Sequence, residues 1–175
     1  YYMDRGYLHF NVLSQQVSIA ADGAGIYIVI GVSEGSLYHF SGFQIANNPL
    51  GRKAQMEKLI TIHAGDVFSR SVVIQSSNAI HRYLGDLGYA FSVVNPEPDV
   101  DDSKHLVYLR YQVLPGQKIY VRRIEFLGNN ATREQVFRQQ FLQLEDSQYS
   151  LSKLNESKRR IANLPYIANV QTQLQ

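Results

Sequence analysis

Apolar and polar positions alternate in three stretches in the middle of the chain, and each stretch is rich in aromatic and β-branched residues. They are LYHFSGFQI at 37–45, YAFSVVNPEP at 89–98 and KHLVYLRYQVLPG at 104–116. A period of two residues is typical of strands that bury one face, so each stretch is predicted to be a strand. We expect the acidic segment PEPDVDD at 96–102, with its two prolines, to form a solvated turn, and the last strand to return antiparallel.

Helical periodicity fills the interval between the first two strands. In 69–88, SRSVVIQSSNAIHRYLGDLG, apolar residues recur at three- and four-residue spacing, so that Ile80 and Leu84 share one face. Gly88 follows at the position where a helix end needs a left-handed residue, which glycine adopts most easily. A shorter helix is predicted within 49–60, and the elements together give the order β-α-α-β-β.

The same pattern returns 81 residues along the chain. Residues 26–48 align with 107–129, and Tyr27 then falls on Tyr108. The corner that follows the second helix also recurs. Its copies are Gly6-Tyr7, Gly88-Tyr89 and, in altered form, Pro165-Tyr166. The period is longer than in common solenoids, so each unit is predicted to be a small domain.

The repeat divides the chain into three units. Residues 1–35 are the last part of one unit, 36–116 are a whole unit, and 117–175 are a unit that lacks its last strand. In this last unit IYVRRIEFLG at 119–128 is predicted to be a strand, and helices are predicted within 130–141 and 150–164. Three strands and two helices predict an α+β fold, in which a three-stranded mixed sheet is covered on one face by the two helices. A domain of this size is near the lower end of independent stability.

Composition and motifs argue against an enzyme. The 175 residues include no cysteine and carry a formal net charge of +2, which excludes thiol chemistry and disfavours binding driven by nucleic-acid phosphates. The five histidines lack metal-ligand spacing, and no nucleophile motif is present. We therefore expect no catalytic residue, no metal and no cofactor. A rival enzyme interpretation would use His63, Asp66 and the acidic segment.

The strand predicted to begin at Tyr89 offers a different kind of site, because an edge strand has unpaired backbone N–H and C=O groups. Its first residues include no charge that would protect the edge. Such an edge can accept an extended peptide by β-augmentation, in which backbone hydrogen bonds supply affinity with little demand on sequence. The alternative is that a neighbouring unit packs against the edge. The candidate peptide-binding residues are Tyr89, Ala90, Phe91, Ser92, Val93 and Val94.

The repeated order, the RGY and LGY corners and the segments VSEGSLYHFSGFQIANN and YVRRIEFLGNNATREQVFRQ resemble the POTRA repeats of the Omp85 family of Gram-negative outer-membrane proteins. The resemblance covers the whole chain. The three units then correspond to the end of a third POTRA repeat, a complete fourth and most of a fifth. It implies a non-enzymatic module on the periplasmic side of the outer membrane, attached to its own C-terminal β-barrel.

The resemblance also implies partners. These are unfolded outer-membrane β-barrel precursors, received for folding and insertion, and the lipoproteins of the assembly machinery, with BamD at the last repeat. Arg138 and Glu145, in FRQQFLQLE, match the expected lipoprotein contact only by this resemblance. Pro165 departs from the family pattern, because it stands where glycine is expected and cannot adopt the left-handed backbone conformation. The third corner is therefore predicted to be built differently.

Two further interpretations stay open. The chain is either the POTRA region of a different Omp85 or TpsB transporter, or a structural spacer that binds no precursor. The spacer interpretation predicts no binding of extended β-strand peptides. Since both end units lack strands of the complete repeat, copies of the chain are also predicted to dimerise or to exchange strands.

Overall fold

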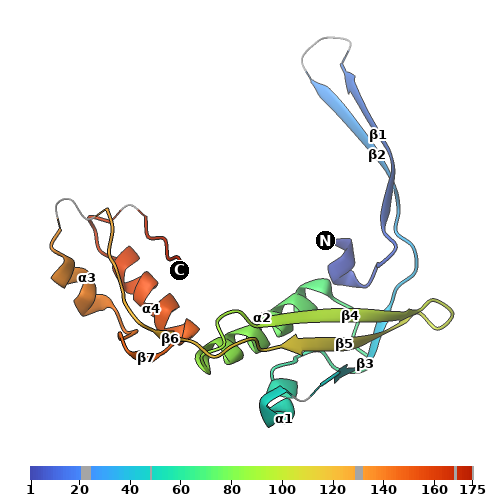
Figure 1. Ribbon diagram of the computed structural model, residues 1–175. Helices are drawn as coiled ribbons and strands as arrows, with labels where there is room; N and C mark the ends of the chain where they lie inside the picture. The colour runs from blue at the N-terminus through green and yellow to red at the C-terminus, as the bar shows by residue number, and fades with distance from the viewer. Residues whose placement is uncertain (21–24, 48, 129–131, 168, 175) are drawn as a thin grey trace.

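The structure, a computed structural model, describes residues 1–20, 25–47, 49–128, 132–167 and 169–174 (Figure 1). Its helices, of which the two labelled η are short 3₁₀-helices, are η1 (Tyr2–Arg5), η2 (Pro49–Gly51), α1 (Lys53–Glu57), α2 (Arg70–Asp86), α3 (Glu134–Gln140) and α4 (Leu151–Ala162). Its strands are β1 (Asn11–Ile19), β2 (Ile26–Ser33), β3 (His39–Ile45), β4 (Val93–Asp101), β5 (Leu106–Leu114), β6 (Tyr120–Val121) and β7 (Ser147–Gln148). The predicted β-α-α-β-β order of the middle unit is confirmed as β3, α1, α2, β4 and β5.

The middle unit has a three-stranded mixed sheet with the strand order β3-β5-β4. The central strand β5 pairs in parallel with β3 and antiparallel with β4, so the predicted α+β fold is confirmed. A parallel pair requires a crossover connection, which α1 and α2 supply. The two edges of the sheet are therefore β3 and β4.

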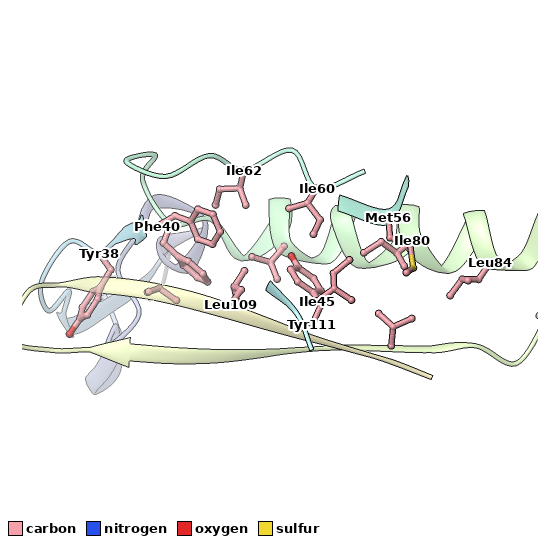
Figure 2. Packing of buried hydrophobic residues seen from close by; sticks show 14 residues of the cluster. Tyr38, Phe40, Ile45, Met56, Ile60, Ile62, Ile80, Leu84, Leu109 and Tyr111 are labelled. Carbon is pink, nitrogen blue, oxygen red and sulfur yellow. The ribbon is translucent and has the colours of Figure 1, made fainter. Parts of the chain in front are cut away.

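The core of the middle unit lies between α2 and the sheet (Figure 2). Alternate side chains of β5 are buried, as its two-residue period predicts. They are Val107, Leu109, Tyr111 and Val113. From α2, Ile80 and Leu84 are fully buried one helical turn apart. The predicted inward face of the long helix is thus the face that covers the sheet.

Helix α2 ends in a hydrogen-bonded cap at Gly88. The Gly88 N–H donates to the C=O of Gly85 (3.1 Å), and the Tyr89 N–H donates to the C=O of Leu84 (3.0 Å). These two bonds define a Schellman cap. Gly88 has a φ of 93°, so the predicted left-handed cap is confirmed.

The strand after this cap begins later than the sequence predicts. The Ser92 N–H donates to the C=O of Tyr89 (3.3 Å), which closes a turn, and β4 begins only at Val93. The prediction that the strand starts at Tyr89 is therefore wrong. The physical reason is that the cap and the turn use the backbone groups that a strand would need.

The prediction that the acidic segment 96–102 is a turn is also wrong. Most of it belongs to β4, where Pro96 lies opposite Tyr111 and Pro98 lies opposite Leu109. Proline is compatible with an edge strand because its nitrogen can point away from the paired neighbour. The turn composition of this segment therefore reflects an edge position.

The first unit consists of η1 and a hairpin of β1 and β2, and the hairpin projects away from the middle unit (Figure 1). Every residue of both strands is exposed, apart from the half-buried Gly31. Neighbouring residues such as Ile28 and Val29 are each 61% exposed. Because successive side chains point to opposite faces, both faces of the hairpin are apolar and open.

In the third unit, the strand predicted at 119–128 is paired only over β6, with β7 as its partner. In the middle unit, β3 pairs along β5, whereas no strand follows α4 among the described residues. A strand is defined by its partner, so the predicted length is wrong. The two predicted helices are present as α3 and α4.

The third corner differs from the other two, as predicted. The Ile167 N–H donates to the C=O of Leu164 (3.0 Å). Pro165 is the second residue of the resulting four-residue turn, a position that suits its fixed φ.

Tyr111 lies in the core with its side chain fully buried. Its hydroxyl has no hydrogen-bond partner within the described residues, and the hydroxyl of Ser76 donates to the C=O of Val72 (2.9 Å). Burial raises the pKa of Tyr111 from 10.0 to about 12. The folded state therefore holds this proton more tightly. Its contribution to stability is complete below pH 10 and is lost as the pH rises towards 12.

We expect Tyr111→Phe to leave the free energy of unfolding at pH 7 nearly unchanged, because the buried hydroxyl forms no hydrogen bond. The substitution should also reduce the loss of stability between neutral and alkaline pH. Urea unfolding at pH 7 and at pH 11 measures both effects. A variant that is much less stable at pH 7, or that loses as much stability at pH 11 as the unaltered chain, would contradict this account.

Candidate peptide-binding edge and partner surface

Strand β4 is the open edge of the middle sheet. The other edge strand, β3, is covered near its start, where the Phe40 N–H donates to the C=O of Asp66 (2.8 Å) and the Gly65 N–H donates to the C=O of Phe40 (2.7 Å). β4 has β5 on one side and, in the part of the chain that the structure describes, no backbone partner on the other. Its outer side can therefore pair with an added strand.

Two prolines decide which groups this edge offers. The backbone groups of successive residues point alternately towards and away from the neighbouring strand. Pro96 and Pro98 are two residues apart and lack an N–H. In a paired edge strand, the backbone groups of such residues point away from the neighbouring strand. Val94 and Val100 are an even number of residues away from these prolines, so their N–H groups also point outward. The edge has donors near its two ends and only acceptors between them.

The structure divides the six candidate peptide-binding residues. Only Val93 and Val94 lie in β4, and the other four precede it. The Ser92 side chain is turned inward, with its hydroxyl 2.8 Å from Nδ1 of His81. Phe91 and Val93 present apolar side chains that are 64% and 55% exposed. The candidate site therefore combines the outward backbone of Val94 with two exposed apolar side chains.

Arg138 of α3 and Glu145 come together in the third unit. Arg138 Nε donates to Glu134 Oε1 (2.7 Å), and its Nη1 donates to Glu145 Oε1 (3.4 Å). Its Nη2 also donates to the C=O of Ile124 (3.1 Å). The Ile124 N–H in turn donates to Glu145 Oε1 (2.8 Å). The two residues thus clamp the same backbone position after β6.

Both side chains of this clamp remain at the surface, with 45% of Arg138 and 37% of Glu145 exposed. Hydrogen bonding, first to Glu134 and then to Glu145, raises the pKa of Arg138. The backbone N–H of Ile124, followed by Arg138, lowers the pKa of Glu145. Both groups are charged at neutral pH and can meet a partner. Their intramolecular role was not predicted from the sequence.

An open groove with a volume of about 520 Å³ runs through the third unit. Its apolar lining includes Phe126, Phe137, Phe141, Leu154 and Ile161. Ile161 corresponds by the repeat to Ile80, which packs beneath the sheet in the middle unit. The groove is thus the helix face that the central strand covers in the complete repeat.

Two residues of the rival enzyme interpretation, His63 and Asp66, lie in an exposed turn, where the His63 N–H donates to Asp66 Oδ2 (2.8 Å), whereas the acidic segment lies mostly in β4. Across the described residues, no three His, Asp or Glu side chains gather as metal ligands would. The same part of the chain contains no helix with both the length and the apolar character needed to cross a bilayer. Among the described residues, His63 and Asp66 thus form no metal-ligand group with the acidic residues of β4.

Comparison with known proteins identifies the family. A model of the POTRA family, described as a surface antigen variable number repeat, matches residues 38–116 and 119–175. The chain belongs to the POTRA family. Outer membrane protein assembly factor BamA of Neisseria meningitidis serogroup B is 33% identical over 172 residues, which are 98% of this chain and 22% of that protein. BamA of Buchnera aphidicola is 28% identical over 97% of this chain and 28% of its own length.

Solved structures show the same POTRA arrangement. The crystal structure of Haemophilus influenzae BamA POTRA3-5 has a TM-score of 0.88 and 28% identity, and it covers 98% of this chain and 68% of that chain. Haemophilus ducreyi BamA lacking POTRA domains 1-3 has a TM-score of 0.67 and 27% identity, and it covers 77% of this chain and 25% of that chain. The predicted resemblance to tandem POTRA repeats is confirmed. The chain spans about a quarter of the length of the BamA relatives it matches.

Proposed function

We propose that this POTRA chain is a periplasmic scaffold for assembly of outer-membrane β-barrels, and that it binds unfolded barrel precursors by β-augmentation at β4. The observation that carries the proposal is the open edge of β4 in a chain whose relatives are named outer membrane protein assembly factors. In this proposal the chain lies on the periplasmic side of the outer membrane, in a protein that also has a membrane β-barrel. No step requires a catalytic residue, a metal or a cofactor.

An unfolded β-barrel precursor suits this edge, because its segments are extended and their backbone groups still need partners. An added strand can accept hydrogen bonds from the N–H groups of Val94 and Val100, and it can donate to the C=O groups of Pro96 and Pro98. The exposed side chains next to Val94 provide apolar contacts. Because the edge offers few N–H donors, an added strand forms few backbone hydrogen bonds and is held weakly. Weak binding suits a scaffold that must pass its precursor on.

Val94→Pro is the substitution that tests this edge. It removes one outward N–H and leaves the hydrogen bonds between β4 and β5 in place. We expect the affinity for a synthetic peptide with the sequence of the last strand of an outer-membrane β-barrel to fall about two- to tenfold, the value of one net backbone hydrogen bond. Titration followed by amide NMR measures both the affinity and the location of binding.

The matched control is Val94→Ala, which keeps the N–H and loses only side-chain packing. We expect this control to bind the peptide nearly as well as the unaltered chain. Equal affinities of the folded proline and alanine variants would refute the edge proposal. Peptide-induced shifts confined to β3 or to the groove of the third unit would assign binding elsewhere.

The proposal also includes docking of the lipoprotein BamD at Arg138 and Glu145. It is supported by the charge of both groups and by their partial exposure in the last repeat. The open faces of the β1–β2 hairpin likewise support exchange of strands between copies of the chain. Each contact is proposed separately from peptide capture.

The spacer interpretation is the second candidate function, and Pro96 and Pro98 favour it because prolines protect edges from added strands. A related Omp85 or TpsB transporter is compatible with the same fold. Peptide titration separates the scaffold from the spacer, since a spacer leaves every amide unshifted.

A further inference from the structure

The corner between the second and third repeats is held by contacts from one helix end. The carboxylate of Asp86, at the end of α2, accepts from the N–H of Ser152 (2.8 Å) and from the hydroxyls of Ser152 (2.6 Å) and Ser150 (2.8 Å). The C=O of Gly88 accepts from the N–H of Ile119 (2.9 Å). The end of α2 thus binds both the second helix and the first strand of the following repeat.

The corner between the first and second repeats has the same two backbone N–H contacts, while the hydroxyls of Ser69 and Ser71 are paired with each other (2.9 Å). Oδ1 of Asp4 accepts from the N–H of Ser71 (2.7 Å), in the first turn of α2. The C=O of Gly6 accepts from the N–H of Tyr38 (2.9 Å). These four residues precede their counterparts at the second corner by 81 or 82 positions. Two independent copies of one arrangement make a chance contact a poor explanation.

The corner glycines leave no room for a side chain. Their φ values are 87° at Gly6 and 93° at Gly88. A Cβ on Gly88 would lie 3.0 Å from the side chain of Lys118 and 3.1 Å from that of Gln148, and a Cβ on Gly6 would lie 2.8 Å from Val67. The contacting residues all belong to the following repeat. Glycine therefore serves both the helix cap and the close approach of the next repeat.

The charge at the corner is unfavourable for its own helix and favourable for the next one. A helix carries partial negative charge at its C-terminus, where Asp86 lies, and partial positive charge at its N-terminus. The first N–H groups of α4 have no partner inside that helix, and the Ser152 N–H is one of them. The contact with α4 therefore offsets the repulsion within α2. The contact with the next repeat therefore explains why an aspartate lies at the end of α2.

The third corner lacks both residues. Asn163 stands where the other corners have aspartate, and Pro165 stands where they have glycine. Asparagine has no charge to place at a helix N-terminus, and proline cannot adopt the left-handed conformation. The two backbone N–H contacts, one to the aspartate and one to the glycine C=O, thus occur at the two corners that touch a following repeat in this structure.

We infer that the Asp-x-Gly corner and the Ser-x-Ser helix start are a docking pair that fixes the orientation of each repeat on the next. The corners are residues 4–6 and 86–88, and the helix starts are residues 69–71 and 150–152. The surface that receives the corner is the first turn of the second helix, and the partner it fits is a carboxylate from the preceding repeat. The inference does not depend on peptide or lipoprotein binding.

Two substitutions test the second corner from opposite sides. Asp86→Ala removes the carboxylate. Ser152→Pro removes both the N–H and the hydroxyl that donate to it, in the first turn of the helix, where proline is tolerated. In the unaltered chain, residual dipolar couplings of the second and third repeats should fit one alignment tensor. In each variant we expect the two repeats to need separate tensors. The double variant should add little to either single change, because both break the same contact.

Asp99→Ala, which removes an acid from β4, is the matched control and should keep a single tensor. In the amide spectrum of the whole chain, the signals of each repeat verify that the variant is folded. A single shared tensor in folded Asp86→Ala and in folded Ser152→Pro would overturn the inference. Loosening in Asp86→Ala alone would also contradict it, because the N–H and the hydroxyl of Ser152 would then have no part in docking.

Discussion

Replacing Ile80 with alanine is expected to lower the free energy of unfolding of the middle repeat by about 2–5 kcal/mol. Ile80 is fully buried on α2 and faces the layer formed by β5 (Figure 2). Shortening it leaves a cavity that the packed neighbours fill only in part. Hydrogen exchange of the β5 amides measures the effect, since exchange reports the middle repeat separately from the end units.

The matched control lies on the same helix. Ile74 is 46% exposed, so Ile74→Ala should cost less than about 1 kcal/mol. Both substitutions make the same chemical change and place the same residue in the helix, which isolates the contribution of burial. Equal losses in the two variants would show that α2 does not cover the sheet through the face that contains Ile80.

The periodicity of the chain was sufficient to predict the β-α-α-β-β order, because each of these patterns is local. The alternation in β5 and the spacing of Ile80 and Leu84 depend only on which face is buried. The start of β4 was missed for an equally local reason. The cap at Gly88 uses the backbone of Tyr89, and nothing in the apolar pattern signals that extra hydrogen bond.

The prolines of β4 led to a wrong prediction for a different physical reason. Pro96 and Pro98 are turn formers by composition, and only the position of the strand within the sheet makes them compatible with pairing. That position follows from the strand order β3-β5-β4, which depends on contacts far apart in sequence. The same prolines restrict the proposed peptide edge, so the correction changes the candidate site as well as the fold.

The side-chain contacts of the sites were the least predictable part. Asp86 and Ser152 are 66 positions apart, and no single-helix pattern relates them. A signal was nevertheless present, because the Ser-x-Ser pairs and the corner aspartates recur with the same spacing as the strands. The clamp of Arg138 on Ile124 had no such signal. Only the family resemblance pointed to Arg138.

Arg138→Ala is expected to weaken binding of the soluble domain of BamD from the same organism by about 30-fold or more, the effect of losing an interface hot spot. The substitution would also remove the hydrogen bonds that Arg138 donates to Glu145 and to the C=O of Ile124. Loss of binding in this variant alone is therefore not decisive. Arg159→Ala, which removes a 70% exposed cation from α4 of the same repeat, is the control for charge and should bind normally.

Glu145→Gln separates partner contact from the intramolecular clamp. Its amide oxygen can still accept from the Ile124 N–H, so the third repeat should keep its fold while losing one negative charge. If Glu145 faces a basic group of the lipoprotein, calorimetry will show weaker binding and a smaller dependence on salt. If Glu145→Gln binds normally and Arg138→Ala only destabilises the third repeat, the pair is a structural clamp, and the lipoprotein docks elsewhere.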